Sequence, residues 1–418
     1  MPAATIVVVG AGQAGCQTAA SLRERGFAGR IVVVGDEDHL PYQRPPLSKG
    51  HITAQVERKN LWLHPESYYA KNDIELRLST VVSEIDRSGK AVVLASGERL
   101  PYDHLVLALG SRNRPLCVDG GGLDGVVALR TLDEADEVRD RLTKATNVVV
   151  VGGGFIGMEI AATAAKIGLG VTVVEVADRL MGRVLSDPAS DFLLTAHRSR
   201  GLQVELRTSV TGIEGDRGVA TGVHTADGRH FPADLVVVGI GAIPNVELAV
   251  AAGLPTGNGI VVNEFLETED PNISAVGDCA SFPSAFADAA VRLESVQNAT
   301  AQPRALAARL AGGPREPYEA VPWFWSDQAD LKIQIAGFAA GHPTAVTRGD
   351  IGEERFSVFC FDSEGRLRGV ESVNKPGDHM AARRLISARV PVTPEQVRDP
   401  GFDPRALASG RQTTGSGT

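Results

Sequence analysis

Two segments of the sequence repeat one pattern of a buried strand, a glycine-rich turn and a helix. They lie about 142 residues apart and read TIVVVGAGQAG at residues 5–15 and NVVVVGGGFIG at residues 147–157. The β-branched run before the first glycine of each segment is typical of a parallel strand that is buried on both faces. Helical periodicity follows in residues 16–25 and 158–167. The repeat therefore predicts two α/β units of the same kind in one chain.

Each predicted turn between strand and helix has the spacing G-x-G-x-x-G. The first glycine makes a tight turn, the second lets the backbone approach a pyrophosphate, and the third lets the helix pack on the strand. Free N–H groups at the helix N-terminus then favour an anion. The glycines are Gly10, Gly12 and Gly15 in the first unit and Gly152, Gly154 and Gly157 in the second. Both turns predict a dinucleotide-binding site.

An acidic residue follows each turn at the end of the next predicted strand. It is Asp36 or Glu37 in the first unit and Glu175 in the second. A carboxylate there accepts hydrogen bonds from ribose hydroxyls and repels a 2′-phosphate, so we expect the second site to prefer NADH to NADPH. A later buried strand closes each unit, at residues 105–110 and at residues 235–241, which end in Gly241. Two dinucleotides in one enzyme imply hydride transfer from a nicotinamide to a second, bound redox cofactor.

Composition excludes several classes of protein. The 418 residues carry a formal charge of −9 without a long run of like charges, which argues against nucleic acid or an anionic membrane as the main partner. No stretch reaches 18 apolar residues and no basic region precedes the first strand, so we expect neither a membrane span nor a signal peptide. The cysteines lack the spacing of a zinc site or a disulfide framework, which favours the cytoplasm. They are Cys16, Cys117, Cys279 and Cys360.

Further motifs resemble the FAD-dependent pyridine-nucleotide reductases. AVGDCA at residues 275–280 is similar to the third FAD motif of that family, in which Gly277 precedes the aspartate, here Asp278, that holds the ribityl chain. Within the family, the chain resembles ferredoxin reductases of the putidaredoxin reductase and dioxygenase type. That likeness rests on PYQRPPLSK (41–49), LRTLDEA (129–135), GGGFIGMEIA (152–161), VGIGAIPN (238–245) and PWFWSDQADLKIQIAG (322–337).

The resemblance implies an α/β, glutathione reductase-like fold with two Rossmann-like domains and a C-terminal α+β interface domain. We expect an FAD-binding domain from residues 1–112 and 244–319 and an NADH-binding domain from residues 113–243. Alternating strands and one helix predict the C-terminal domain at residues 320–408. Residues 409–418 are rich in Gly, Ser and Thr and are predicted to be disordered.

The absence of cysteine from residues 41–49 bears on the electron acceptor. Disulfide reductases and peroxidases that this chain resembles carry redox cysteines there, so reduced FAD is expected to pass its electrons directly to an outside acceptor. The resemblance implies a 2Fe-2S ferredoxin that supplies a cytochrome P-450 or a Rieske-type oxygenase. Two alternatives stay open: a rubredoxin or quinone-type reductase, and an NADH-responsive switch of the apoptosis-inducing-factor type.

The same resemblance assigns three catalytic roles. Lys49 is expected beside the reactive edge of the flavin, where a cation stabilises developing negative charge. Glu159, in the first turn of its helix, is expected near the nicotinamide and paired with Lys49 across the two domains. Trp325 is expected to shield the flavin on the side that faces the ferredoxin. Each residue also has a plainer interpretation. Lys49 would be a solvated surface lysine, Glu159 a carboxylate favoured by the helix dipole, and Trp325 an aromatic residue of the core.

Other residues are expected near the cofactors or the partner. Arg44, beside Pro45, and Arg130 resemble cations that reach the FAD, and surface capping is their alternative. Arg183 resembles a residue at the mouth of the NADH cleft, and Val296 lies in a segment that faces the pyrimidine end of the flavin. Because 2Fe-2S ferredoxins are usually acidic, docking needs a local positive patch, and a monomer is favoured. Candidates for that patch are Arg304, Arg309 and Lys332.

Overall fold

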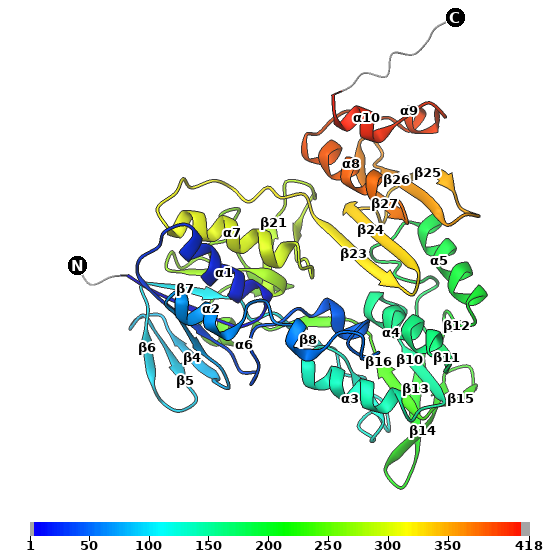
Figure 1. Ribbon diagram of the computed structural model, residues 1–418, viewed down its shortest axis with the longest axis horizontal. Helices are drawn as coiled ribbons and strands as arrows, with labels where there is room; N and C mark the ends of the chain where they lie inside the picture. Colours follow the sequence, from blue (N-terminus) through cyan, green and yellow to red (C-terminus); the bar gives the residue numbers. More distant parts are fainter. Residues whose placement is uncertain (1–3, 411–418) are drawn as a thin grey trace, which may run out of the picture. The chain divides into compact units, whose positions relative to one another are not determined.

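The computed structural model describes residues 4–410, which divide into two compact units (Figure 1). The first contains residues 4–43, Arg58–Arg112 and Ala242–Ala320, and the second contains Arg44–Glu57, Asn113–Gly241 and residues 321–410. Of the tail predicted at residues 409–418, Ser409 and Gly410 are described and the rest lies outside the described residues. Within residues 4–410, no helix has the length and apolar character needed to cross a bilayer.

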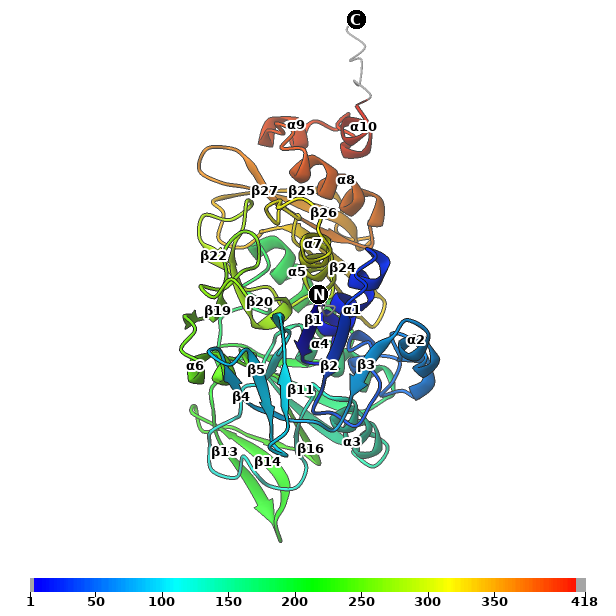
Figure 2. The same ribbon diagram turned by 90° about the vertical axis from the view of Figure 1, so that its left-hand side faces the viewer.

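A parallel sheet forms the centre of the first unit. Its strands lie in the order β20–β7–β1–β2–β3, and each neighbouring pair is parallel. Their bounds are Thr5–Val9 for β1, Arg30–Val34 for β2, Ile74–Arg77 for β3, His104–Leu107 for β7 and Ile273–Ala275 for β20. Helix α1 (Gln13–Glu24) packs on β1 and β2, and α7 (Asn298–Leu310) lies beside α1 (Figure 2). The valines and isoleucines of β1 and β2 are buried because helices and smaller sheets cover both faces.

Shorter elements complete the first unit. One antiparallel sheet consists of β4 (Val82–Asp86), β5 (Ala91–Leu94) and β6 (Arg99–Pro101). A mixed sheet consists of β18 (Thr256–Gly257), β19 (Gly259–Val261), β21 (Ala280–Pro283) and β22 (Ala290–Val291), in which β19 and β21 pair in parallel. The remaining elements are α2 (Glu66–Lys71), α6 (Glu247–Ala251), and the 3-10 turns η2 (Arg58–Asn60) and η3 (Gly277–Cys279). Strands β8 (Ser111–Asn113) and β17 (Ala242–Pro244) form a two-stranded sheet.

The second unit repeats the parallel sheet, in the order β12–β11–β10–β16–β9. These strands are β9 (Val126–Ala128), β10 (Asn147–Val151), β11 (Gly170–Val174), β12 (Gln203–Glu205) and β16 (Leu235–Val238). The helices that accompany them are α3 (Leu132–Leu142), α4 (Phe155–Lys166) and α5 (Asp187–Ser199). A three-stranded antiparallel sheet follows, of β13 (Val210–Asp216), β14 (Val219–Thr225) and β15 (His230–Pro232). Segment Arg44–Glu57, which contains η1 (Pro45–Ser48), belongs to this unit because it contacts α3 and α4.

The C-terminal part of the second unit is an antiparallel sheet in the order β23–β24–β27–β26–β25. Its strands are β23 (Trp323–Gln328), β24 (Leu331–Gly337), β25 (Thr344–Asp350), β26 (Arg355–Phe361) and β27 (Leu367–Val373). Helices α8 (Pro376–Ser387), α9 (Pro394–Arg398) and α10 (Pro404–Ala408) follow. The predicted α/β class, with two Rossmann-like domains and a C-terminal α+β region, is confirmed, and each of the two parallel sheets has five strands.

Candidate functional site

The first glycine turn lies between β1 and α1. Gly10 has a φ of +110°, and a Cβ atom there would lie 2.2 Å from the carbonyl oxygen of Ala108. A Cβ atom on Gly15 would lie 1.8 Å from the carbonyl oxygen of Gly10, so only glycine lets the helix approach the strand this closely. Gly12, the N-cap of α1, has no neighbouring atom within 4 Å of its Cβ position. The helix has no side-chain cap and no acidic residue in its first turn, so an anion fits its N-terminus.

The second glycine turn, between β10 and α4, has the same geometry. Gly152 has a φ of +109°, and its Cβ position lies 2.5 Å from the carbonyl oxygen of Gly239. The Cβ position of Gly157 lies 2.3 Å from the carbonyl oxygen of Gly152. Gly154 is the open position, with its nearest neighbour 3.9 Å away, and α4 also begins without a side-chain cap or an acidic residue. Both turns therefore leave space at the middle glycine, where a pyrophosphate needs the backbone to be accessible.

Two of the carboxylates after these turns, Glu37 and Glu175, accept hydrogen bonds from the protein. Tyr42 donates its hydroxyl to Glu37 at 2.5 Å, while Asp36 is exposed. Glu175 accepts the backbone N–H of Gly153 at 2.5 Å and that of Ala177 at 2.7 Å. A carboxylate offers about four lone-pair positions, so these contacts leave acceptor capacity for a ribose diol.

The third FAD-like motif lies beside the first glycine turn. Gly277 has a φ of +77°, and a Cβ atom there would lie 2.9 Å from the Cβ atom of Ala14 in α1. Asp278 follows in η3 and accepts the hydroxyl of Ser111 at 3.2 Å. Val296 precedes α7 and is half-buried. The turn, the acidic residues and Asp278 follow the carboxyl ends of β1, β2 and β20, the edge at which open parallel sheets bind ligands.

A buried carboxylate organises the polar centre of the second unit. Glu159 is 4% exposed, and its Oε2 atom lies 2.6 Å from the Nζ atom of Lys49 and 2.5 Å from the Oγ atom of Ser48. Its Oε1 atom accepts the hydroxyl of Ser326 at 2.6 Å. These donors satisfy a carboxylate that burial would otherwise make costly.

Two of the expectations for this pair need correction. Glu159 is the fifth residue of α4 and lies beyond the first turn, so a simple interaction with the helix dipole does not explain it. Lys49 lies in the same compact unit as Glu159, because the contacts of the Arg44–Glu57 segment are with α3 and α4. The ion pair therefore lies within one unit.

The hydrogen bonds continue into residues that the sequence did not single out. Gln328 donates to the Oγ atom of Ser326 at 3.2 Å, and its Oε1 atom lies 2.6 Å from the Nε2 atom of His197. Burial lowers the pKa of His197, which favours the neutral imidazole. The only available sequence signal was Ser326 and Gln328 themselves, two polar residues at alternating positions of a strand that buries one face.

Arg44 and Arg130 are brought together although they are far apart in the sequence. Arg44 donates from its Nη1 atom to the backbone oxygen of Arg130. Glu134, which forms the capping box of α3 with Thr131, also accepts the backbone N–H of Arg130 at 2.6 Å. Elsewhere in the unit, Arg183 is exposed, and its Nη2 atom lies 3.4 Å from the Cβ position of Gly241.

Trp325 lies on β23 next to Ser326, and its side chain points to the opposite face of the strand. It is half-buried, and its ring centroid lies 5.6 Å from that of Trp323. The guanidinium of Arg383 in α8 lies 4.4 Å from the centroid of Trp323, so a cation lies beside this pair of indoles.

One of the candidate docking cations is already engaged. The Nη1 atom of Arg309 lies 3.0 Å from Glu267, and its Nη2 atom donates to Ser274 at 3.2 Å. Arg309 therefore does not supply free positive charge to a partner. Arg304 and Lys332 are exposed on α7 and β24.

Two parallel sheets, each with a glycine turn shaped for a dinucleotide, define a two-dinucleotide oxidoreductase scaffold. The pyridine nucleotide-disulphide oxidoreductase family model matches residues 4–303, and the reductase C-terminal model matches residues 323–408. The chain belongs to the pyridine nucleotide-disulphide oxidoreductase family.

Relatives of the chain are similar over nearly its whole length. Rhodocoxin reductase from Rhodococcus erythropolis is 50% identical over 399 residues, which cover 96% of this chain and 93% of the relative. The crystal structure of a ferredoxin reductase for the CYP199A2 system from Rhodopseudomonas palustris has a TM-score of 0.94 and 48% identity, covering 97% of this chain and 99% of that one. The reductase in a covalent putidaredoxin reductase–putidaredoxin complex has a TM-score of 0.95 and 40% identity, covering 98% and 99%.

Proposed function

We propose that this enzyme is an FAD-containing, NADH-dependent ferredoxin reductase. The observation that carries the proposal is the pair of glycine turns, each open at its middle glycine and each followed by a carboxylate. The similarity to rhodocoxin reductase and to the ferredoxin reductase of the CYP199A2 system supports the choice of acceptor. When bound, FAD would supply the redox chemistry that links the two-electron hydride of NADH to a one-electron acceptor.

The first unit is proposed to hold FAD. Its residues for this role are Gly10, Gly12, Gly15, Asp36, Glu37, Gly277, Asp278 and Val296. The second unit is proposed to hold NADH through Gly152, Gly154, Gly157, Glu175, Arg183 and Gly241. Arg44, Pro45, Lys49 and Arg130 are proposed as further cofactor-binding residues. The domain functions follow from these assignments, with the boundaries expected at residues 112, 243 and 319.

Lys49 and Glu159 are proposed to act as a pair. Lys49 supplies a positive charge that would stabilise the negative charge developing at the isoalloxazine during hydride transfer. Glu159 fixes the position of that ammonium group, while Ser48 and Ser326 hold the carboxylate. Trp325 is proposed to shield the flavin and to shape the surface that receives the partner.

Direct electron transfer from the flavin to an outside acceptor agrees with the burial and the pKa of the cysteine thiols. All four are free, and burial, as the largest cause, raises the pKa of Cys16 and of Cys279 to about 11. Buried thiols with a raised pKa are poor nucleophiles, which argues against Cys16 and Cys279 as members of a redox relay. We propose a 2Fe-2S ferredoxin that supplies a cytochrome P-450 or Rieske-type oxygenase, and a reducing, cytoplasmic location.

The test is steady-state reduction of a purified 2Fe-2S ferredoxin by NADH, followed through cytochrome c. Turnover of several electrons per second or faster supports the reductase. Fast reduction of a rubredoxin or a quinone, but not of the ferredoxin, would assign another acceptor. A long-lived reduced complex without turnover would favour a conformational switch.

The role of Glu159 is tested separately by stopped flow. Glu159→Gln is expected to slow flavin reduction by NADH about tenfold or more, with unchanged FAD content, because the ammonium of Lys49 loses its charged partner. Glu137→Gln, on the exposed side of α3, is the matched control. Equal reduction rates in the two variants would remove this role.

A further inference from the structure

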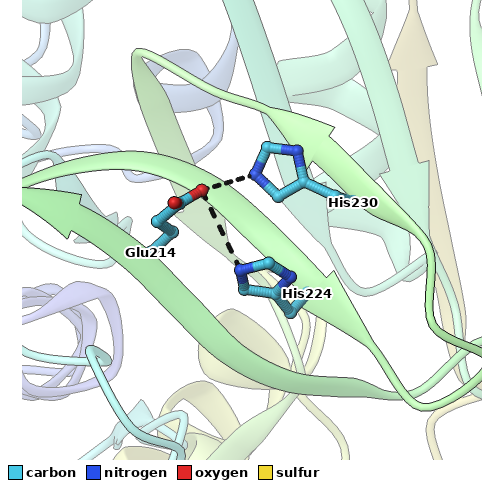
Figure 3. A group of neighbouring side chains, drawn as sticks. All are labelled: Glu214, His224 and His230. Carbon is cyan, nitrogen blue, oxygen red and sulfur yellow. Dashed lines mark ion pairs between the residues drawn. The ribbon is translucent and has the colours of Figure 1, made fainter.

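A pair of histidines lies on the exposed face of the β13–β14–β15 sheet. His224 on β14 and His230 on β15 are directly opposite each other in the antiparallel register, and their ring centroids lie 4.8 Å apart. Glu214 on β13 points towards the same place (Figure 3). Each of the three strands therefore contributes one side chain to a single cluster.

The alternation of the sheet explains why these side chains share a face. Ile213, Val223 and Phe231 form a neighbouring row that is buried in the core of the second unit. Because successive side chains of a strand point to opposite faces, the residue adjacent to each member of this row points outward. Side chains of Glu214, His224 and His230 are accordingly 52%, 51% and 38% exposed.

Glycines leave room for the cluster. Gly222 is paired with Glu214, and Gly212 is paired with His224, so within the β13–β14 pair neither polar side chain has a side chain directly opposite it. A Cβ atom on Gly222 would lie only 2.1 Å from the Nε2 atom of His230. The imidazole of His230 therefore occupies the space above Gly222 and reaches Glu214 across the strand.

The distances are those of a partly assembled metal site. The Oε2 atom of Glu214 lies 2.8 Å from the Nε2 atom of His230 and 3.9 Å from the Nε2 atom of His224. In a tetrahedral zinc site with bonds of about 2.0–2.1 Å, neighbouring ligand atoms lie about 3.3 Å apart. The observed distances lie on either side of this value, and side chains this exposed adjust by half an ångström at low cost.

The ligand types select a class of ion. Imidazole nitrogen suits Zn²⁺, Cu²⁺ and Ni²⁺, whereas Mg²⁺ and Ca²⁺ prefer sites built from oxygen. Within residues 4–410, this is the only group of three or more potential metal ligands whose ligating atoms lie within 4.8 Å of one another. None of the three residues belongs to the glycine turns or to the Lys49–Glu159 cluster.

We propose that Glu214, His224 and His230 bind one divalent ion of the zinc type, with water completing the coordination. The ion joins three adjacent strands, so its binding free energy adds to the stability of this sheet. The site is independent of the reductase chemistry, and its loss leaves that chemistry intact.

The experiment uses the full-length, FAD-loaded protein without an affinity tag, freed of metal with a chelator and then dialysed. Titration calorimetry with ZnCl₂ is expected to give one site per chain, and a parallel titration with MgCl₂ is expected to give none. His224→Ala and His230→Ala are expected to weaken Zn²⁺ binding by about tenfold or more, because losing even an outer partner of a metal ligand costs about 10–100-fold. Glu214→Gln provides a variant that keeps both histidines. His342→Ala, a histidine outside the cluster, is the matched control.

Thermal unfolding of the same proteins gives a second readout. At one fixed Zn²⁺ concentration, the Tm is expected to rise more in the parent and in His342→Ala than in the cluster variants. NADH-dependent dye reduction, equal in all variants, checks that they are folded. Absence of binding up to about 1 mM Zn²⁺, or equal binding in the parent and the two histidine variants, would overturn the proposal.

Discussion

A buried carboxylate in the C-terminal sheet makes a contribution to the stability of this protein that decreases as the pH rises. Most carboxylates in folded proteins have the opposite effect. Glu371 on β27 is 1% exposed, and it accepts the backbone N–H of Ser186 at 2.8 Å together with the hydroxyl of the same serine. Ser186 is the N-cap of α5. Burial, the largest cause, raises the pKa of Glu371 from 4.5 to about 7, although the serine and Arg179 act in the opposite sense.

The sign of the effect follows from proton binding in the two states. Between pH 4.5 and about pH 7 the folded protein keeps the proton on Glu371, while the unfolded chain releases it. Stability from this group is therefore fully present below pH 4.5 and is lost as the pH rises to about 7. At 1.36 kcal/mol per pKa unit, the loss is about 3 kcal/mol.

Glu371→Gln removes the charge and keeps an oxygen that accepts the N–H of Ser186. We expect the variant to match the parent at pH 5, where the parent carboxyl is protonated when folded. At pH 8 the variant is expected to unfold about 5 °C or more higher, since about 1 kcal/mol shifts the Tm of a unit of 150–250 residues by about 2–4 °C.

Differential scanning calorimetry of the FAD-loaded proteins at both pH values measures this difference. Glu364→Gln, on the exposed loop before β27, is the control, and its Tm is expected to follow that of the parent at both pH values because it keeps Glu371. A Tm difference between variant and parent that is the same at pH 5 and pH 8 would refute the reasoning.

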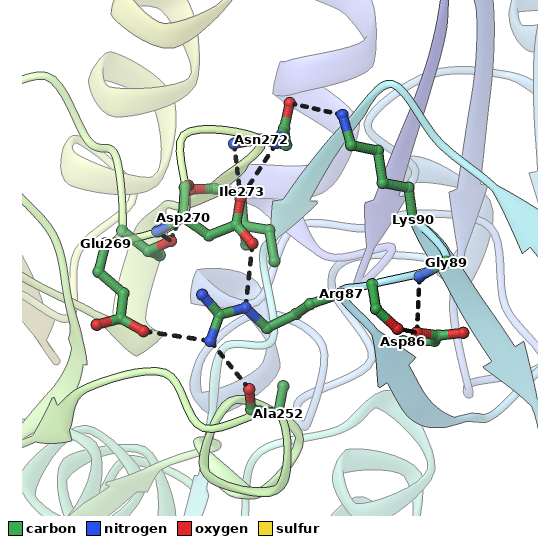
Figure 4. A network of polar contacts seen from close by, with 11 residues as sticks. Asp86, Arg87, Gly89, Lys90, Ala252, Glu269, Asp270, Asn272 and Ile273 are labelled. Carbon is green, nitrogen blue, oxygen red and sulfur yellow. Dashed lines mark hydrogen bonds and ion pairs between the residues drawn. The ribbon is translucent and has the colours of Figure 1, made fainter.

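Four further outcomes are expected. Gly15→Val yields protein without flavin absorbance, because the new Cβ atom would lie 1.8 Å from the carbonyl oxygen of Gly10. Trp325→Ala lowers ferredoxin-coupled reduction of cytochrome c about tenfold while reduction of a small dye changes little, as for an aromatic docking residue. Arg87→Ala destabilises the first unit by about 1 kcal/mol in a urea titration, because Arg87 joins Asp270 and the carbonyl of Ala252 (Figure 4). Raising the salt from about 0.05 to 0.5 M slows the ferredoxin-coupled rate more than the dye rate, which initial rates of both reactions measure.

The sequence predicted the features that depend on local backbone geometry. Gly10 and Gly152 mark both turns because a positive φ beside a neighbouring carbonyl favours a residue without a Cβ atom. The β-branched runs before them predicted β1 and β10, since parallel strands covered on both faces need apolar residues at every position. The later strands end earlier than predicted, at Leu107 and Val238, because the segments after them leave the parallel sheets.

Only the tertiary structure decided which distant side chains meet. Glu159, Ser326 and His197 lie on three separate elements, and no periodicity within any one of them indicates that they form one hydrogen-bonded cluster. Their contacts depend on how the C-terminal sheet packs against α4 and α5. From the sequence, Arg309 was a candidate cation for docking. Packing places Glu267 beside it, and the sequence does not indicate that ion pair.

The proposed metal site and the placement of the Arg44–Glu57 segment also depend partly on the local sequence and partly on tertiary packing. The alternation of β14 and β15 puts each histidine on an exposed face, but the strand register makes His224 and His230 opposite neighbours. The sequence by itself determined the class of fold and the two dinucleotide-type turns, because these arise from propensities of consecutive residues. Tertiary packing decided ion pairs, buried networks and the grouping into units, because residues far apart in the chain meet only when whole elements are in place.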